Sequence, residues 1–265
     1  MRRLRSIRAL LAVVAVGAIA CTGGDEAGEL AANQAEGPDE IRIDAVAEHG
    51  RQFDEELPAR DAGSQQEFAA ASYITGHLQQ AGYRVRLDSV PFKDLVRSTN
   101  VVALPPGGDE PEAVVTVLYD TTTGTPPHGR DIGLFLELAR ALRVQEPDHN
   151  VQFVALGAEV SSHGGGNLGS RELAAELVDL DEPPPVIGLL EVSSGGFRAP
   201  GPAGDDLNRV AIDMGVPAAR PLTEPLLVTY LRATEIMQAQ GIPHAIAAGG
   251  IEEVGGVVLA YLTSL

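Results

Sequence analysis

The sequence has no tryptophan and a single cysteine, Cys21, among its 265 residues. A lone cysteine excludes a fold held together by intrachain disulfides. Aromatic residues make up only 4% of the chain, which disfavours a sugar-binding surface built from stacked rings. We find no internal repeat of 20–50 residues, so a solenoid is not expected.

Positive charge is also scarce. The 19 lysine and arginine residues face 37 aspartate and glutamate residues, which gives a formal net charge of −18. A protein this acidic is not expected to bind nucleic acid or the surface of an anionic membrane.

The first forty residues carry the pattern of an exported protein. An uncharged, mostly apolar run at 9–20 is too short for a stable membrane anchor, so residues 1–20 are expected to be a signal peptide. Small residues before Cys21 indicate cleavage by a lipoprotein signal peptidase and a lipidated Cys21; the alternative is an ordinary secretory signal that ends at Ala20. The acidic, glycine-rich residues 21–40 are expected to form a flexible tether. The chain would then be lipid-anchored in the cell envelope, on a periplasmic or extracellular face.

Residues 41–265 are expected to form a single α/β domain. Apolar runs at 113–119, 151–156 and 185–192 are typical of strands buried on both faces of a parallel sheet. Apolar positions at helical spacing alternate with them, which predicts a three-layer, doubly wound, mostly parallel sheet with helices on both faces. The predicted helices are 68–81, 132–142, 168–177, 226–237 and 254–265, and the further strands are 83–90 at an edge, 101–104 and 245–248.

Sites in such sheets lie beyond the carboxyl ends of the strands, which here carry Asp120, Glu159 and Glu191. The segments at these ends resemble the zinc aminopeptidase family that includes bacterial aminopeptidase S and the glutaminyl cyclases. The resemblance covers about 55–265 and is most specific in 114–175. Its motifs are RDAGS at 60–64, NVVALPPG at 100–107, VVTVLYD at 114–120, LFLELARAL at 134–142, FVALGAE at 153–159, LGSR at 168–171 and GIP at 241–243.

The resemblance implies two zinc ions about 3.5–4 Å apart that share a water molecule, which attacks the scissile carbonyl. It also implies five ligands: a His, a bridging Asp, a Glu, a second Asp and a second His. The chain resembles a degenerate member of this family. The segment with the last His is missing, because Gly249–Gly250 runs almost directly into the final helix. The other ligand positions fall on Leu118, near Pro127, on Val160 and on Ser193.

Two functional positions of the family are kept. Glu159 stands at the position of the general base, and Asp120 at that of the aspartate that orients a ligand. Without ligands to hold a metal, Glu159 is interpreted as a carboxylate that caps the following turn, and the alternative is a working base.

Three hypotheses follow. In the first, the domain has no hydrolytic activity and no cofactor, and it binds a peptide, a small ligand or a protein partner in the former active-site cleft. In the second, Asp120, His128, Asp131, Glu159 and His163 form a rebuilt zinc site of a peptidase. In the third, the chain is a structural component of the envelope. An open pocket lined by Asp120, Glu159 and Ser193 would favour the first hypothesis, and a filled cleft the third.

Overall fold

The computed structural model describes residues 39–265 except 94–95, 105–109, 146–148, 162, 193–194 and 221–223. The side chains of Lys93 and His163 are also outside the description. The expected signal peptide, the lipidation of Cys21 and residues 21–38 of the expected tether therefore lie outside the described residues, as do Ser193 and Ser194.

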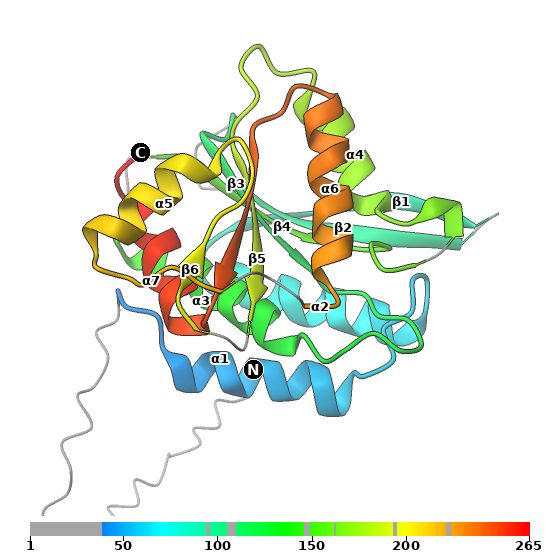
Figure 1. The fold of residues 1–265 in the computed structure, drawn as a ribbon. Coiled ribbons are helices and arrows are strands. Elements are labelled where there is room, and N and C mark those ends of the chain that lie inside the picture. Colours follow the sequence, from blue (N-terminus) through cyan, green and yellow to red (C-terminus); the bar gives the residue numbers. More distant parts are fainter. Residues whose placement is uncertain are drawn as a thin grey trace, which may run out of the picture. The chain divides into compact units, whose positions relative to one another are not determined.

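The centre of the fold is one sheet. Within the described residues it has seven strands in the order β1-β2-β4-β3-β5-β7-β6 (Figure 1). The four central strands are parallel: β4 (Val151–Leu156), β3 (Ala113–Leu118), β5 (Val186–Glu191) and β7 (His244–Gly249). Antiparallel strands flank them: β1 (Arg84–Lys93), β2 (Val96–Leu104) and the short β6 (Phe197–Arg198).

Helices cover both faces of the sheet (Figure 1). One face carries α3 (Gly129–Gln145) and α7 (Ile251–Leu262), with α1 (Ile43–Arg51) packed on the outer side of α3. The same hydrophobic cluster includes residues of α2 (Gln65–Gln80) and α5 (Gly204–Asp213). The other face carries α4 (Leu168–Leu177) and α6 (Leu227–Ala239). Two short turns complete the elements, a π-helical turn η1 at Gln52–Glu56 and a 3₁₀ turn η2 at His163–Gly165.

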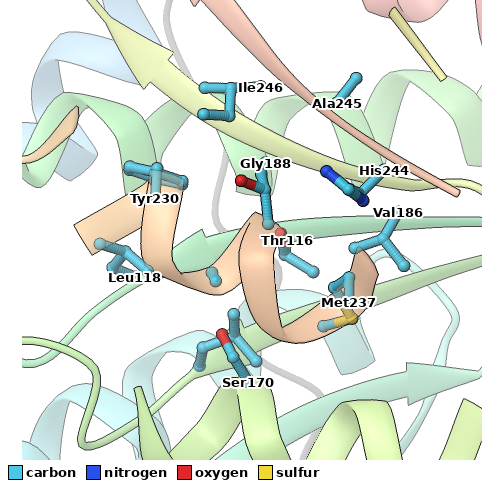
Figure 2. Close-up of a pocket in the computed structure, with 13 residues that line it drawn as sticks. Thr116, Leu118, Ser170, Val186, Gly188, Tyr230, Met237, His244, Ala245 and Ile246 are labelled. Atoms are coloured by element: carbon cyan, nitrogen blue, oxygen red, sulfur yellow. The ribbon is translucent and has the colours of Figure 1, made fainter. Parts of the chain in front are cut away.

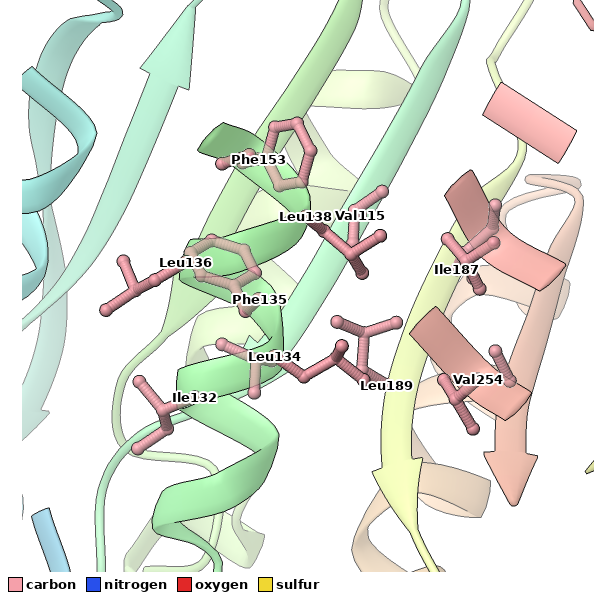
Figure 3. Packing of buried hydrophobic residues seen from close by; sticks show 14 of the residues in the cluster. Val115, Ile132, Leu134, Phe135, Leu136, Leu138, Phe153, Ile187, Leu189 and Val254 are labelled. Atoms are coloured by element: carbon pink, nitrogen blue, oxygen red, sulfur yellow. The ribbon is translucent and has the colours of Figure 1, made fainter. Parts of the chain in front are cut away.

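The sheet separates two apolar cores because successive side chains of a strand point to opposite faces. Val115 and Val117 of β3 contribute to the core beneath α3 and α7, where Phe135 and Phe153 pack (Figure 3). Leu118 contributes to the second core, beneath α4 and α6. All six residues of β3 are buried, as expected for a strand covered on both faces. The three-layer α/β fold predicted from the sequence is confirmed.

The close approach of α1 to α3 depends on glycine. A Cβ atom on Gly129 would lie 2.3 Å from the Gly50 carbonyl oxygen, and one on Gly133 would lie 2.4 Å from the Val46 oxygen. Neither α1 nor α5 was predicted from the sequence, and β6 was also missed. Among the described helices, none combines the length and apolarity needed to cross a bilayer.

Candidate functional site

The topology places a crevice at the carboxyl ends of β3 and β5. From β3 the chain continues to β4 on one side of β3, while β5 lies on the other side of β3. The strand order changes direction at this point, and ligands of doubly wound sheets bind in the crevice that such a switch point creates. A cavity of about 190 Å³ opens here, which we call the switch-point cavity. Its lining residues are Pro126, Pro127, His128, Asp131, Leu190, Glu191, Glu224, Pro225 and Leu226.

Asp120 lies just beyond β3 and is completely buried. Its carboxylate accepts hydrogen bonds from the backbone amides of Glu159, at 3.0 Å, and Val160, at 3.2 Å. Burial and the nearby Glu159 carboxylate raise the pKa of Asp120 well above its usual range. Asp120 therefore holds the turn that follows β4, and its carboxylate is not reached from the cavity.

Glu159 lies in that turn and is 1% exposed. Its Oε1 accepts from the Ser170 backbone amide at 2.6 Å, and its Oε2 accepts from Ser170 Oγ at 2.7 Å and Asn167 Nδ2 at 2.8 Å. Ser170 lies in the first turn of α4, where backbone amides have no partner within the helix. Burial raises the pKa of Glu159, and the donors from Ser170 and Asn167 oppose that rise. Both carboxylate oxygens are thus engaged in fixing the start of α4.

Two positions at which the resemblance implies metal ligands, Leu118 and Val160, carry apolar side chains. Leu118 is 1% exposed and belongs to the second core, and Val160 packs against the same core. Figure 2 shows Leu118 with Tyr230 and Ile246 in the wall of a second cavity beneath α6. This cavity of about 20 Å³ has room for about one water molecule. Alkyl side chains cannot coordinate zinc, so the residues present do not fit the di-zinc centre that the resemblance implies.

Arg60 is a buried cation beside the crevice, with 1% of its surface exposed. Its Nη1 donates to the carbonyl oxygens of Phe53, at 2.6 Å, and Leu57, at 2.7 Å, and its Nε donates to the Tyr119 oxygen at 2.6 Å. Burial lowers the pKa of Arg60 to about 10, so the guanidinium remains charged at neutral pH. Arg60 ties the end of β3 to the segment that follows α1.

His128 is buried against this cation. Its Nδ1 lies 3.1 Å from the Pro126 carbonyl oxygen, which requires an N–H at Nδ1, and its Nε2 then accepts from Arg60 Nη2 at 3.3 Å. Burial and the Arg60 charge lower the pKa of His128 to about 4. The ring is therefore neutral at physiological pH, and both of its nitrogens are occupied.

Asp131 lies in the first turn of α3 and is 3% exposed. Its Oδ1 accepts from the Glu191 backbone amide at 2.7 Å, while no donor reaches Oδ2 within the described part of the chain. Glu191 itself forms an ion pair with Arg130, with 2.8 Å between Nη1 and Oε1. Burial and the neighbouring Glu191 and Asp54 carboxylates raise the pKa of Asp131 well above its usual range.

The structure thus divides the residues of the rebuilt-site hypothesis into two groups. His128 and Asp131 line the switch-point cavity, whereas Asp120 and Glu159 are covered by backbone and side-chain donors. No three His, Cys, Asp or Glu side chains among the described residues are placed to hold a metal ion. The fifth residue of that hypothesis, His163, has its side chain outside the description.

Asp120 and Glu159 do not line an open pocket, because neither carboxylate is accessible. For these two residues the condition that would favour the first hypothesis is not met, and Ser193 lies outside the described residues. An open cavity is lined instead by Glu191 and Glu224. The sequence places Glu191 at the end of a strand, where a site is expected, but suggests no role for it. Glu224 follows no recognisable motif, and only the fold brings it to the cavity.

Comparison with known proteins gives a clear result for the fold alone. No protein-family model matches the sequence, and no curated protein matches it. The fold is similar to that of a Zn-dependent exopeptidase from Parabacteroides distasonis, with a TM-score of 0.63, 14% identity, and coverage of 86% of this chain and 100% of the other. It is also similar to a glutaminyl cyclase from Fimbriiglobus ruber (TM-score 0.64, 17% identity, 85% and 96% covered). A zinc aminopeptidase from Bacillus subtilis gives a TM-score of 0.62 at 13% identity, with 84% and 95% covered.

These likenesses agree with the family resemblance of the sequence motifs. The chain has the fold of the zinc-dependent exopeptidases and glutaminyl cyclases.

Proposed function

We propose that this chain is an exported binding domain with a metallopeptidase-like fold, which binds a peptide or protein ligand at the switch-point cavity and does not hydrolyse it. The observation that carries the proposal is the burial of Leu118 in the apolar core at the position of the first metal ligand. Restoring a metal there would require a polar side chain in that core, which costs free energy unless it is paired.

The state of the general base supports the same proposal. A general base must reach the proton that it abstracts, within hydrogen-bond distance or through one water molecule. Glu159 is 1% exposed, and its oxygens accept three hydrogen bonds from Ser170 and Asn167. Its interpretation as a carboxylate that caps the turn before α4 accounts for all of these contacts.

The size of the cavity limits what can bind. Pockets that enclose a whole drug-sized ligand measure about 300–1,000 Å³, whereas the switch-point cavity measures about 190 Å³. It is therefore large enough for one side chain of a larger partner. The peptide or protein ligand that we propose would insert one side chain there.

The cellular location is part of the proposal. We propose that Cys21 is lipidated after removal of residues 1–20, and that the acidic segment 21–40 tethers the domain to the membrane of the cell envelope. Contact with the membrane would then occur through the lipid alone. Metabolic labelling with a radioactive fatty acid tests this: Cys21→Ser should abolish the label, and labelling that persists in the variant would contradict it.

Hydrolysis is tested with the purified full chain, zinc salts and two kinds of substrate, an aminoacyl p-nitroanilide and a peptide with N-terminal glutamine. We expect neither p-nitroaniline release nor cyclisation above the rate without protein. A bacterial zinc aminopeptidase and a glutaminyl cyclase assayed in parallel control for the first and the second substrate. Turnover that a chelator abolishes and zinc restores would favour a rebuilt zinc peptidase and overturn the proposal.

A further inference from the structure

The switch-point cavity is lined by three carboxylates. Asp131 is 3% exposed, while Glu191 and Glu224 are half-buried. Pro126, Pro127 and Pro225 line the same cavity and are more exposed than Asp131, and the buried residues Leu190 and Leu226 complete the lining.

One oxygen of Asp131 has no donor among the described residues. Its Oδ1 is bonded to the Glu191 amide, and no described residue donates to Oδ2. Among the described residues, only the Thr75 hydroxyl and Arg143 Nε are fully buried side-chain atoms without a hydrogen-bond partner. The Oδ2 of Asp131 is therefore not fully buried, and the residue lines the switch-point cavity.

The negative charge of the cavity is only partly compensated. Arg130 forms an ion pair with Glu191 at 2.8 Å, and its side chain remains 45% exposed. Burial raises the pKa of Glu191; the Arg130 charge opposes that rise, and the smaller effects of the Asp54 and Glu224 charges add to it. His128 contributes no positive charge, because Arg60 and burial keep its ring neutral.

The arrangement of these carboxylates does not favour a bound metal ion. Asp131, Glu191 and Glu224 line one cavity, yet no three acidic or histidine side chains in the described part of the chain are close enough together to hold a metal ion. A larger organic cation can bridge such a spacing. An ammonium group donates up to three hydrogen bonds in different directions, which suits carboxylates supplied by separate elements.

We propose that the switch-point cavity binds a lysine side chain of the partner, with its ammonium group at Asp131 and its methylene stem beside the lining proline residues. This inference rests on the proposed function, since it names the chemistry of the ligand for that site. Lysine suits a mainly polar cavity edged by proline rings, because it lays its methylene groups along apolar surface while its charged end is solvated or paired. The net charge of −18 would attract a basic partner and raise the rate of encounter.

The inference is tested by a ligand-observed NMR titration of the purified full chain. The probe is Nα-acetyl-lysine N-methylamide, whose blocked backbone leaves the side chain as its only cation, and the matched neutral probe is Nα-acetyl-norleucine N-methylamide. We expect the lysine probe to bind and the norleucine probe to bind about tenfold more weakly or not at all, since a hydrogen bond to a charged group is replaced by an apolar contact.

Two variants locate the site. Asp131→Asn keeps an oxygen for the Glu191 amide and should weaken lysine binding about tenfold, and Glu224→Gln, at a half-exposed position, should weaken it in the same direction. Glu172→Gln, on the outer face of α4, is the matched control and should leave binding unchanged. Circular dichroism of each variant checks that the fold is intact.

Three results would overturn the inference: no binding of the lysine probe, equal binding of both probes, or lysine binding that both cavity variants leave intact. Failure of the proposed function has a different signature. Zinc-dependent hydrolysis by the same preparation would overturn the binding-domain proposal, whereas the titration reports only on the cavity.

Discussion

Acid should destabilise this fold through His128. The folded state holds the pKa of His128 at about 4, against an ordinary value of 6.5, because the ring is buried against Arg60. The unfolded chain therefore binds a proton at this residue more readily than the folded chain. The contribution of His128 to stability is fully present above pH 6.5 and is lost as the pH falls toward 4. Between pH 7 and pH 5 the loss amounts to about 2 kcal/mol, since each pKa unit corresponds to about 1.4 kcal/mol.

Other groups titrate in the same range, so one pH profile cannot isolate His128. Burial and the neighbouring His77 lower the pKa of His49 to about 4 as well, although its partial exposure weakens its effect on stability. The buried carboxyls of Asp120 and Asp131 act in the opposite direction. Their pKa values are raised, so protonation favours the folded state at acid pH.

The His128→Gln variant separates these contributions. The variant should be less stable than the wild type at pH 7, because hydrogen bonds to Arg60 and Pro126 are lost. Between pH 7 and pH 5, however, its free energy of unfolding should fall by about 2 kcal/mol less than that of the wild type. Urea unfolding at pH 7 and at pH 5, at constant ionic strength, measures the stability and its acid loss. Far-ultraviolet circular dichroism detects the unfolding, because the chain has no tryptophan. His149→Gln, at a partly exposed histidine 3.1 Å from Glu112, is the control and should retain the wild-type acid loss. Equal acid losses in the wild type and His128→Gln would refute the reasoning.

Three further predictions concern the same region. Leu118→Ala should lower the free energy of unfolding by about 3 kcal/mol in urea denaturation. Leu87→Ala, at a side chain that is 53% exposed, should change it by less than about 0.5 kcal/mol. Equally small effects of both substitutions would show that Leu118 does not belong to the hydrophobic core. Glu159→Ala should cost about 3 kcal/mol and speed hydrogen exchange at the Ser170 amide, and unchanged exchange there would contradict the anchoring role. Ala158→Gly should stabilise the fold by about 1 kcal/mol in the same urea assay, because Ala158 has a left-handed backbone with φ 55°, and a loss of stability would contradict this.

The sequence predicts the central elements well because their apolar patterns are long and regular. The predicted 151–156 strand and 168–177 helix coincide with β4 and α4, and the continuous apolar run at 113–119 matches β3 to within one residue. The α5 helix was missed because its buried residues, Leu207 and Ala211, are few and follow a segment rich in proline and glycine.

The candidate site was harder to predict because its character depends on burial. The sequence places Asp120 and Glu159 at strand ends, but only the fold shows that Ser170 and Asn167 occupy the oxygens of Glu159. In the same way, the sequence places Asp131 just before a predicted helix, at 132–142. Only the fold shows that it lies in the first turn of α3, accepts a hydrogen bond from the Glu191 amide and lines the switch-point cavity.

The central claim is that the core of this metallopeptidase-like fold has closed over the position of the metal centre. The most direct test is elemental analysis of the purified full chain after incubation with zinc and exhaustive dialysis, beside a bacterial zinc aminopeptidase treated identically. Our account predicts stoichiometric zinc in the aminopeptidase and only background zinc in this protein. Stoichiometric zinc that survives dialysis, and that is lost in Asp120→Asn or Glu159→Gln, would contradict it.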